Sequence, residues 1–275
     1  MPTPPEPGPD LTAAPHRAEM PVGSERLLEN RSLAGHRRLA ALLQPGMRVL
    51  DVGCGSGAIT RGIAAAVAPG GEVVGLDPSR HLLERAAALS VGHPNLRFVV
   101  GSVDDARFAA EFDVVTAARV LQWLAEPLAA LRAMVGYTRP GGHVLVLDYN
   151  HVEARWDPPA PPEFLRFYTA FLEWREGAGM DNLIADHLPA MFRACGLTGI
   201  RDTDESESTE PSDPGYLAHA ALWCDVAATR GHQMVADGAL SEAERAAAEA
   251  AMRGWVERRE GRQTLCLRAC VGRRP

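Results

Sequence analysis

The feature that most constrains the fold is an apolar strand that runs into three glycines spaced two residues apart. The strand is predicted over residues 47–52, the glycines are Gly53, Gly55 and Gly57, and a helical segment follows over residues 58–68. Glycine has no Cβ, so such a turn accepts positive φ angles and lets a ligand approach the backbone. A loop of this kind after a first strand indicates an open α/β sheet with a nucleotide-like ligand at the carboxyl ends of its strands.

Two acidic residues accompany the glycine loop. Asp51 lies two residues before the first glycine, and Asp77 ends the next apolar strand, residues 72–76. An acid at the second position can accept hydrogen bonds from the ribose hydroxyls of an adenosine. The glycines alone do not identify the ligand, because the first two of them and Ala58 also satisfy the dinucleotide pattern G-x-G-x-x-G/A.

The first half of the chain alternates strands with helices. Further strands are predicted over residues 96–100, 112–117 and 143–147, and helices over residues 24–43, 79–89 and 126–137. Strands that alternate with helices indicate a parallel sheet with right-handed crossovers.

Four motifs follow one another between residues 25 and 150. They are D-V-G-C-G-S-G at 51–57, G-L-D-P-S at 75–79, F-D-V-V at 112–115 and R-P-G-G at 139–142. This ordered set resembles the motifs of class I S-adenosylmethionine-dependent methyltransferases, in the small-molecule (type 11, ubiquinone-biosynthesis-like) branch. The resemblance implies an α/β, Rossmann-like sheet of seven mostly parallel strands with helices on both faces. It also implies S-adenosyl-L-methionine as the cofactor.

The second half of the chain is expected to add a helical cap. Cap segments are predicted at about residues 151–195, which include a proline-rich link and aromatic helices, and at about residues 213–260. Strands are predicted over residues 197–203 and 264–271. The resemblance implies that the last strand inserts antiparallel between the fifth and the sixth.

The N-terminal segment is expected to differ from the rest. Residues 1–21 contain seven prolines and little that could pack, which predicts a disordered tail. Residues 22–275 are then expected to form a single methyltransferase domain that includes the cap.

Composition limits the partners and the setting. No apolar run approaches the roughly 20 residues of a membrane span, and no signal peptide is expected. Five cysteines without a C-x-x-C spacing suggest reduced thiols, so a cytoplasmic protein without a metal site is expected. A net charge of −7 without a dense basic run argues against nucleic acid as a partner. The expected assembly is a monomer or a homodimer.

The resemblance places the cofactor around the glycine loop and the ends of the neighbouring strands. The residues that it implies as cofactor-binding are Asp51, Gly53, Cys54, Gly55, Gly57, Asp77, Pro78, Ser102, Val103 and Arg119. Asp51 would orient the loop or meet the cofactor amino group, and Asp77 would hold the ribose hydroxyls. Its alternative role is that of a helix N-cap, because Pro78 and Ser79 follow it.

The residues that would contact the adenine amine and the carboxylate of the cofactor stay open. Many relatives have an aspartate where this chain has Ser102, so another partner for the adenine amine is needed. The candidates are the carboxylate of Asp104 or Asp105 and the backbone near Val103. Arg119 would pair with the cofactor carboxylate in a charge-assisted contact. Arg26 and Arg31 are further candidates for that role, and an ordinary surface arginine is the alternative for all three.

The methyl acceptor is expected beyond the fifth strand, where a loop would hold His151 near the mouth of the site. Imidazole takes a proton near neutral pH, so His151 is the candidate general base, and Tyr149 completes the catalytic set by orienting the acceptor. The expected substrate contacts are Asn150, Trp156, Phe167, Tyr168 and Phe171. The last three recur at helical spacing, which core packing would also explain.

These features predict transfer of a methyl group to an O, N or C atom of a small, partly apolar or aromatic metabolite, in natural-product tailoring or quinone-like metabolism. Two alternatives stay open. One is a cyclase or isomerase that binds S-adenosylmethionine without methyl transfer. The other is an NAD-dependent oxidoreductase, which the absence of lysine disfavours because many such enzymes use a Tyr-Lys pair.

Overall fold

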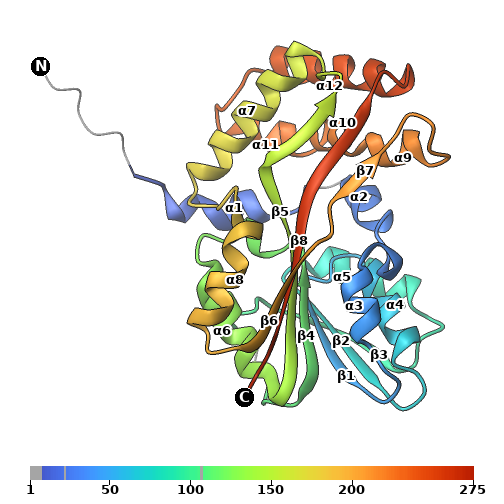
Figure 1. Ribbon diagram of the computed structural model, residues 1–275. Coiled ribbons are helices and arrows are strands. Elements are labelled where there is room, and N and C mark those ends of the chain that lie inside the picture. Colours follow the sequence, from blue (N-terminus) through green and yellow to red (C-terminus); the bar gives the residue numbers. More distant parts are fainter. Residues whose placement is uncertain (1–7, 22, 106–107) are drawn as a thin grey trace, which may run out of the picture.

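The computed structural model describes residues 8–21, 23–105 and 108–275, apart from the side chain of Arg26. In this part of the chain eight strands form one sheet in the order β3-β2-β1-β4-β5-β8-β6, with β7 paired to β8 (Figure 1). The strands are β1 (Arg48–Val52), β2 (Glu72–Asp77), β3 (Leu96–Val100), β4 (Phe112–Ala118), β5 (Thr138–Asp157), β6 (Thr198–Asp204), β7 (Glu207–Thr209) and β8 (Arg262–Arg273). The expectation of seven strands is corrected to eight, because the three-residue β7 is too short to leave a periodic pattern.

The strand directions agree with the resemblance. β1 to β5 pair in parallel, and β8 lies antiparallel between β5 and β6. The carboxyl ends of the parallel strands therefore meet at one edge of the sheet.

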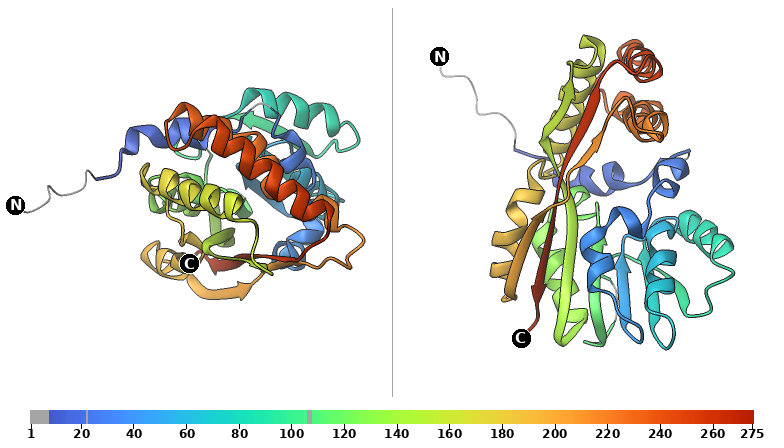
Figure 2. Two further views of the ribbon diagram at one scale, coloured as in Figure 1. Left: turned by 90° about the horizontal axis from the view of Figure 1, so that it is seen from above. Right: turned by 45° about the vertical axis from the view of Figure 1, so that its right-hand side comes forward.

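Helices cover both faces of the sheet (Figure 2). They are α3 (Arg37–Leu42), α4 (Ala58–Ala66), α5 (Arg80–Leu89), α6 (Pro127–Tyr137) and α8 (Ile184–Ala194). Successive strand residues point to opposite faces. Val49 accordingly packs with residues of α3 and α4, and Leu50 packs in a second cluster that includes residues of α6 and α8.

The cap is carried by an extension of two strands. β5 continues beyond the expected end at residue 147 and stays paired with β8 as far as Asp157 and Arg262. The helices at this end are α7 (Pro162–Glu176), α9 (Tyr216–Ala220), α10 (Leu222–Ala228), α11 (Arg230–Ala236) and α12 (Glu242–Glu257) (Figure 1).

Two expectations about the first cap segment are corrected. Residues 151–157 continue strand β5 instead of leaving the sheet, because β8 pairs again with residues 155–157 after a register shift beyond Asn150. α8 covers the sheet rather than the cavity, since Ile184, Leu188 and Phe192 are fully buried in the cluster beneath the strands.

The first predicted helix, residues 24–43, is broken into short pieces. α2 (Glu25–Glu29) and η2 (Leu33–Gly35) precede α3. Ser32 lies between them with φ −152° and ψ 161°, which is extended backbone. Serine favours such non-helical positions because its hydroxyl competes with helical hydrogen bonds.

Residues 8–21 correct the expectation of a disordered tail. η1 (Leu11–Ala13) and α1 (Ala14–Ala18) are helical, and residues 1–7 of the predicted tail lie outside the described part. Pro15 stands in the first turn of α1, where a missing N–H costs nothing. Proline content therefore did not prevent this segment from folding against the cap.

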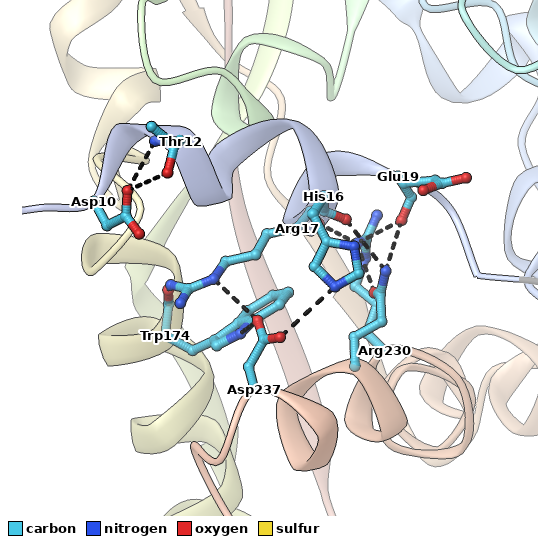
Figure 3. A network of polar contacts seen from close by, with 9 residues as sticks. Asp10, Thr12, His16, Arg17, Glu19, Trp174, Arg230 and Asp237 are labelled. Carbon is cyan, nitrogen blue, oxygen red and sulfur yellow. Dashed lines mark hydrogen bonds and ion pairs between the residues drawn. The ribbon is translucent and has the colours of Figure 1, made fainter.

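The contacts that hold this segment converge on two cap residues (Figure 3). Asp237, after α11, accepts a hydrogen bond from Arg17 Nε at 3.2 Å and one from Trp174 Nε1 at 2.7 Å, and lies 3.6 Å from His16 Nε2. Arg230 donates to the carbonyl of Arg17 at 2.7 Å. We call these contacts the N-terminal latch.

Within the described ranges, the helices are all too short or too polar to pass through a lipid bilayer.

Candidate cofactor and acceptor site

A cavity of about 1110 Å³ lies between the carboxyl ends of the parallel strands and the cap. Its walls come from the glycine loop, the end of β2, the extended parts of β5 and β8, α1 and α10. Pockets for single ligands usually measure about 300–1,000 Å³. The volume is therefore sufficient for two small molecules side by side, as a cofactor and an acceptor would require.

The glycine loop brings bare backbone to the cavity wall. Gly53 and Gly55 line the cavity with φ angles of 68° and 53°, and a Cβ on Gly53 would overlap the side chain of Val120. Gly57, with φ 71°, stands at the N-cap of α4 behind the wall. Cys54 also lines the cavity, and burial raises the pKa of its thiol well above the usual value. A thiol in that state fills space and does not act as a nucleophile.

Asp77 lies on the cavity wall and is tied to backbone. It accepts hydrogen bonds from Gly55 N–H at 2.9 Å and from Ser79 N–H at 2.8 Å, and burial raises its pKa. The N-cap of α5 is Ser79, whose hydroxyl accepts from Leu82 N–H, so Asp77 does not have the alternative role of a cap. Each carboxylate oxygen has lone pairs for a further donor.

Asp51 lies behind the loop and does not line the cavity. Its carboxylate accepts a hydrogen bond from Thr60 Oγ1 at 2.7 Å, and burial raises its pKa to about 7. Asp51 thus joins the end of β1 to α4 and supports the loop from beneath.

The remaining predicted cofactor residues lie on the cavity wall, and the two candidate acids after them differ in position. Pro78, Ser102 and Val103 line the cavity together with Asp104, and Asp105 does not.

Arg119 belongs to a polar cluster on the cavity wall. It has a positive φ of 62°, its Nε donates to the Tyr149 hydroxyl at 2.9 Å, and its Nη2 pairs with Glu207. Arg31 donates to the same hydroxyl at 3.1 Å and lies 3.6 Å from Glu207. Arg119 therefore already has a carboxylate partner within the chain. The side chain of Arg26 lies outside the described part.

His151 is a buried strand residue, which corrects the expectation of a loop at the mouth. Pairing with β8 continues through Asn150, so this stretch is β5, and the His151 ring lines the cavity from within. Its Nε2 lies 2.5 Å from Gln122 Oε1. Burial, and then the positive charge of Arg175, lower its pKa well below the usual value. His151 is therefore a neutral hydrogen-bonding group that holds a proton poorly.

The predicted substrate contacts are only partly on the wall. Phe171 and Asn150 line the cavity, and the Asn150 amide donates to Asp186 at 2.6 Å. The other three do not line it: Trp156 and Tyr168 pack against Trp223, and Phe167 packs against Phe164 in the same apolar cluster.

Sequence reasoning missed several residues in or beside the cavity. Trp223 comes from α10 and lines the cavity, and Glu207 comes from β7 and pairs with Arg119 on the cavity wall. Gln122 belongs to the loop after β4 but had no assigned role. None of the three carries a motif of its own, because contacts between distant elements bring each of them to the site.

Comparisons with known proteins agree with this geometry. Residues 50–146 match a family described as a methyltransferase domain. The chain is 36% identical over 109 residues to a ubiquinone biosynthesis O-methyltransferase of Vibrio parahaemolyticus, a match that covers 38% of this chain and 45% of that protein. It is 31% identical over 178 residues to a demethylmenaquinone methyltransferase of Staphylococcus aureus, covering 58% of this chain and 71% of that protein.

A solved structure extends the comparison beyond the matched segment. The YcgJ protein of Bacillus subtilis superposes with a TM-score of 0.57 at 17% identity, covering 88% of this chain and 98% of that one. At this identity the likeness concerns the fold. The chain spans less than half the length of the ubiquinone-type relative.

Proposed function

The chain belongs to the class I S-adenosylmethionine-dependent methyltransferases. We propose that it transfers a methyl group to an O, N or C atom of a small metabolite that is partly apolar or aromatic. The observation that carries the proposal is the single cavity that joins a bare glycine loop and Asp77 to an aromatic wall. The names of the two curated relatives support a quinone-like ring as the acceptor. Tailoring of a natural product is the alternative setting.

The residues present fit the cofactor. The backbone at Gly53 and Gly55 leaves room for close approach, and Asp77 retains lone pairs for ribose hydroxyls. When bound, S-adenosylmethionine supplies a methyl group made electrophilic by its sulfonium. The chain then has to hold the acceptor in near-attack geometry and to exclude water.

The acceptor end of the cavity suits these tasks. Phe171 and Trp223 offer apolar ring surface, and Tyr149 offers a hydroxyl that two arginines already engage as an acceptor. The remaining hydrogen of that hydroxyl is available to a bound molecule. Tyr149 would therefore orient an oxygen or nitrogen of the acceptor.

The partners are part of the same proposal. A net charge of −7 without a dense basic run supports a small molecule rather than nucleic acid. Free cysteines throughout the chain support a cytoplasmic setting. A monomer or a homodimer would suffice, because the described cavity is built within one chain.

Calorimetric titration of the purified protein tests the cofactor site. We expect S-adenosylmethionine and S-adenosylhomocysteine to bind, and NAD not to bind. Asp77→Ala should weaken both by about 10²-fold or more, because each hydrogen bond to a charged group contributes roughly 1.5–3 kcal/mol. Asp105→Ala, which removes a nearby acid outside the cavity wall, is the matched control and should leave the affinities unchanged.

Two outcomes would contradict the proposal. Equal loss in both variants would remove the role of Asp77, and binding of NAD alone would replace methyl transfer by hydride chemistry. Product mass separates the remaining alternative, since a methyltransferase adds one methylene to its acceptor and a cyclase or isomerase adds no mass.

A further inference from the structure

Gln122 occupies a restrained position on the cavity wall. It lies in η3 (Leu121–Trp123) and is 2% exposed. Its Nε2 donates to the Arg119 carbonyl at 3.1 Å, and its Oε1 lies 2.5 Å from His151 Nε2. Its backbone N–H donates to Asp148 at 3.2 Å. Hydrogen bonds therefore fix both the side-chain amide and the backbone of Gln122.

The direction of these hydrogen bonds follows from what each atom can do. A backbone carbonyl can only accept, so the amide end next to Arg119 must be the NH₂ group. The other end is then the oxygen, which can only accept. His151 Nε2 must accordingly carry a hydrogen. A neutral imidazole has a single ring hydrogen, so Nδ1 of His151 holds a lone pair.

That lone pair has no partner within the described part of the chain. Among the described residues Nδ1 of His151 has no hydrogen-bond partner, and it is not one of the fully buried unpaired atoms. Both ring nitrogens of His36, by contrast, are fully buried and unpaired. Because the His151 ring lines the cavity, its Nδ1 is accessible from there. Burial and the charge of Arg175 keep the ring neutral.

We propose that Gln122 is a positioning residue that holds His151 in the Nε2–H tautomer, so that the cavity presents a bare Nδ1 to an O–H or N–H group of the methyl acceptor. The identity of that group as part of a methyl acceptor rests on the proposed function, whereas the tautomer does not. A hydroxyl or an amine is thereby favoured over a carbon nucleophile, which has no such hydrogen to donate.

Nitrogen NMR on protein labelled with ¹⁵N-histidine tests the tautomer directly, since protonated and bare ring nitrogens have well-separated shifts. The His151 signals are identified by their loss in His151→Phe. We expect one bare Nδ1 and one protonated Nε2 in the wild type. Gln122→Met should remove this pattern, with the two shifts moving toward each other, because a methionine side chain has no amide oxygen to accept from Nε2–H.

Gln263→Met is the matched control. Gln263 is also buried and accepts a hydrogen bond from a ring nitrogen, that of Trp156 at 3.2 Å, but it is not hydrogen-bonded to the His151 ring. This variant should leave the His151 pattern unchanged. A wild-type His151 that carries its hydrogen on Nδ1 would overturn the proposal without any variant, and so would an unchanged pattern in Gln122→Met.

Small probes test the group that Nδ1 accepts. Phenol at millimolar concentration should move the Nδ1 shift toward the protonated value, and benzene should not. Equal shifts with both probes, or none with phenol, would remove the acceptor part of the proposal. Calorimetry with S-adenosylhomocysteine on the same sample reports separately on the proposed function.

Discussion

At the scale of single residues, the glycine loop should tolerate no side chain at its first position. Gly53→Ala would force a left-handed backbone, which costs about 1–2 kcal/mol, and would crowd Val120, which costs about 1–3 kcal/mol more. We expect a loss of roughly 2–5 kcal/mol in the free energy of unfolding, measured by denaturant titration, and a loss of S-adenosylhomocysteine binding. Gly92→Ala is the control, because a Cβ there meets nothing. Equal effects of both changes would contradict this account.

Single residues also show how far local pattern predicts a site. Gly53 and Asp77 were predicted to bind the cofactor, and both line the cavity, because each follows a strand whose end the sequence marks. For Asp51 two roles were expected, orienting the loop or meeting the cofactor; it lies behind the wall and supports the loop, because a carboxylate at a strand end can face either side. Glu207 lies 88 residues beyond its partner Arg119, and only the completed sheet brings them together.

At the scale of elements, pairing overrides local propensity. Asp148 and Asn150 are poor strand formers, and they predicted that β5 would end before them. β8 nevertheless pairs with both, which carries β5 onward into the cap and moves His151 from a loop to a strand. The parallel direction of the first five strands was predictable from the alternation of strands with helices. The length of this ribbon was not, because it depends on a partner more than a hundred residues away.

The N-terminal latch is an element whose strength can be measured. Asp237→Ala removes the acceptor of Arg17 and Trp174, and the remaining contacts should hold residues 8–21 less tightly. A loss of roughly 1–2 kcal/mol would raise the open population about 5–30-fold. Trypsin cleavage after Arg17, followed by mass spectrometry, should accelerate by the same factor.

A matched ion pair elsewhere separates the latch from general surface effects. Asp202→Ala removes the partner of Arg268 on β6 and should leave cleavage after Arg17 unchanged. If Asp237→Ala cleaves no faster than Asp202→Ala, the latch does not hold the segment.

At the scale of the whole molecule, buried groups set two opposing dependences of stability on pH. Burial raises the pKa of Asp51 and of Asp148 to about 7 each, from an ordinary 3.8. Burial lowers the pKa of His36 to about 3 from 6.5, and that of His151 falls well below 6.5. The carboxyls bind more protons in the folded state, so they reduce stability as the pH rises from about 4 to about 7. The histidines bind fewer, so they reduce stability as the pH falls below 6.5.

The two effects share the window between about pH 4.5 and 6.5, and single replacements should separate them. Relative to wild type, the free energy of unfolding of Asp51→Asn should rise by about 1.4 kcal/mol per pH unit across that window, because one group that bound a proton only when folded has gone. The value for His36→Phe should fall by the same amount per unit, because one group that bound a proton only when unfolded has gone. Urea titrations at several pH values measure both slopes. A slope near zero in either variant would show that the replaced group titrates in the folded protein as it does in the unfolded chain, and its burial would then have no electrostatic effect on stability.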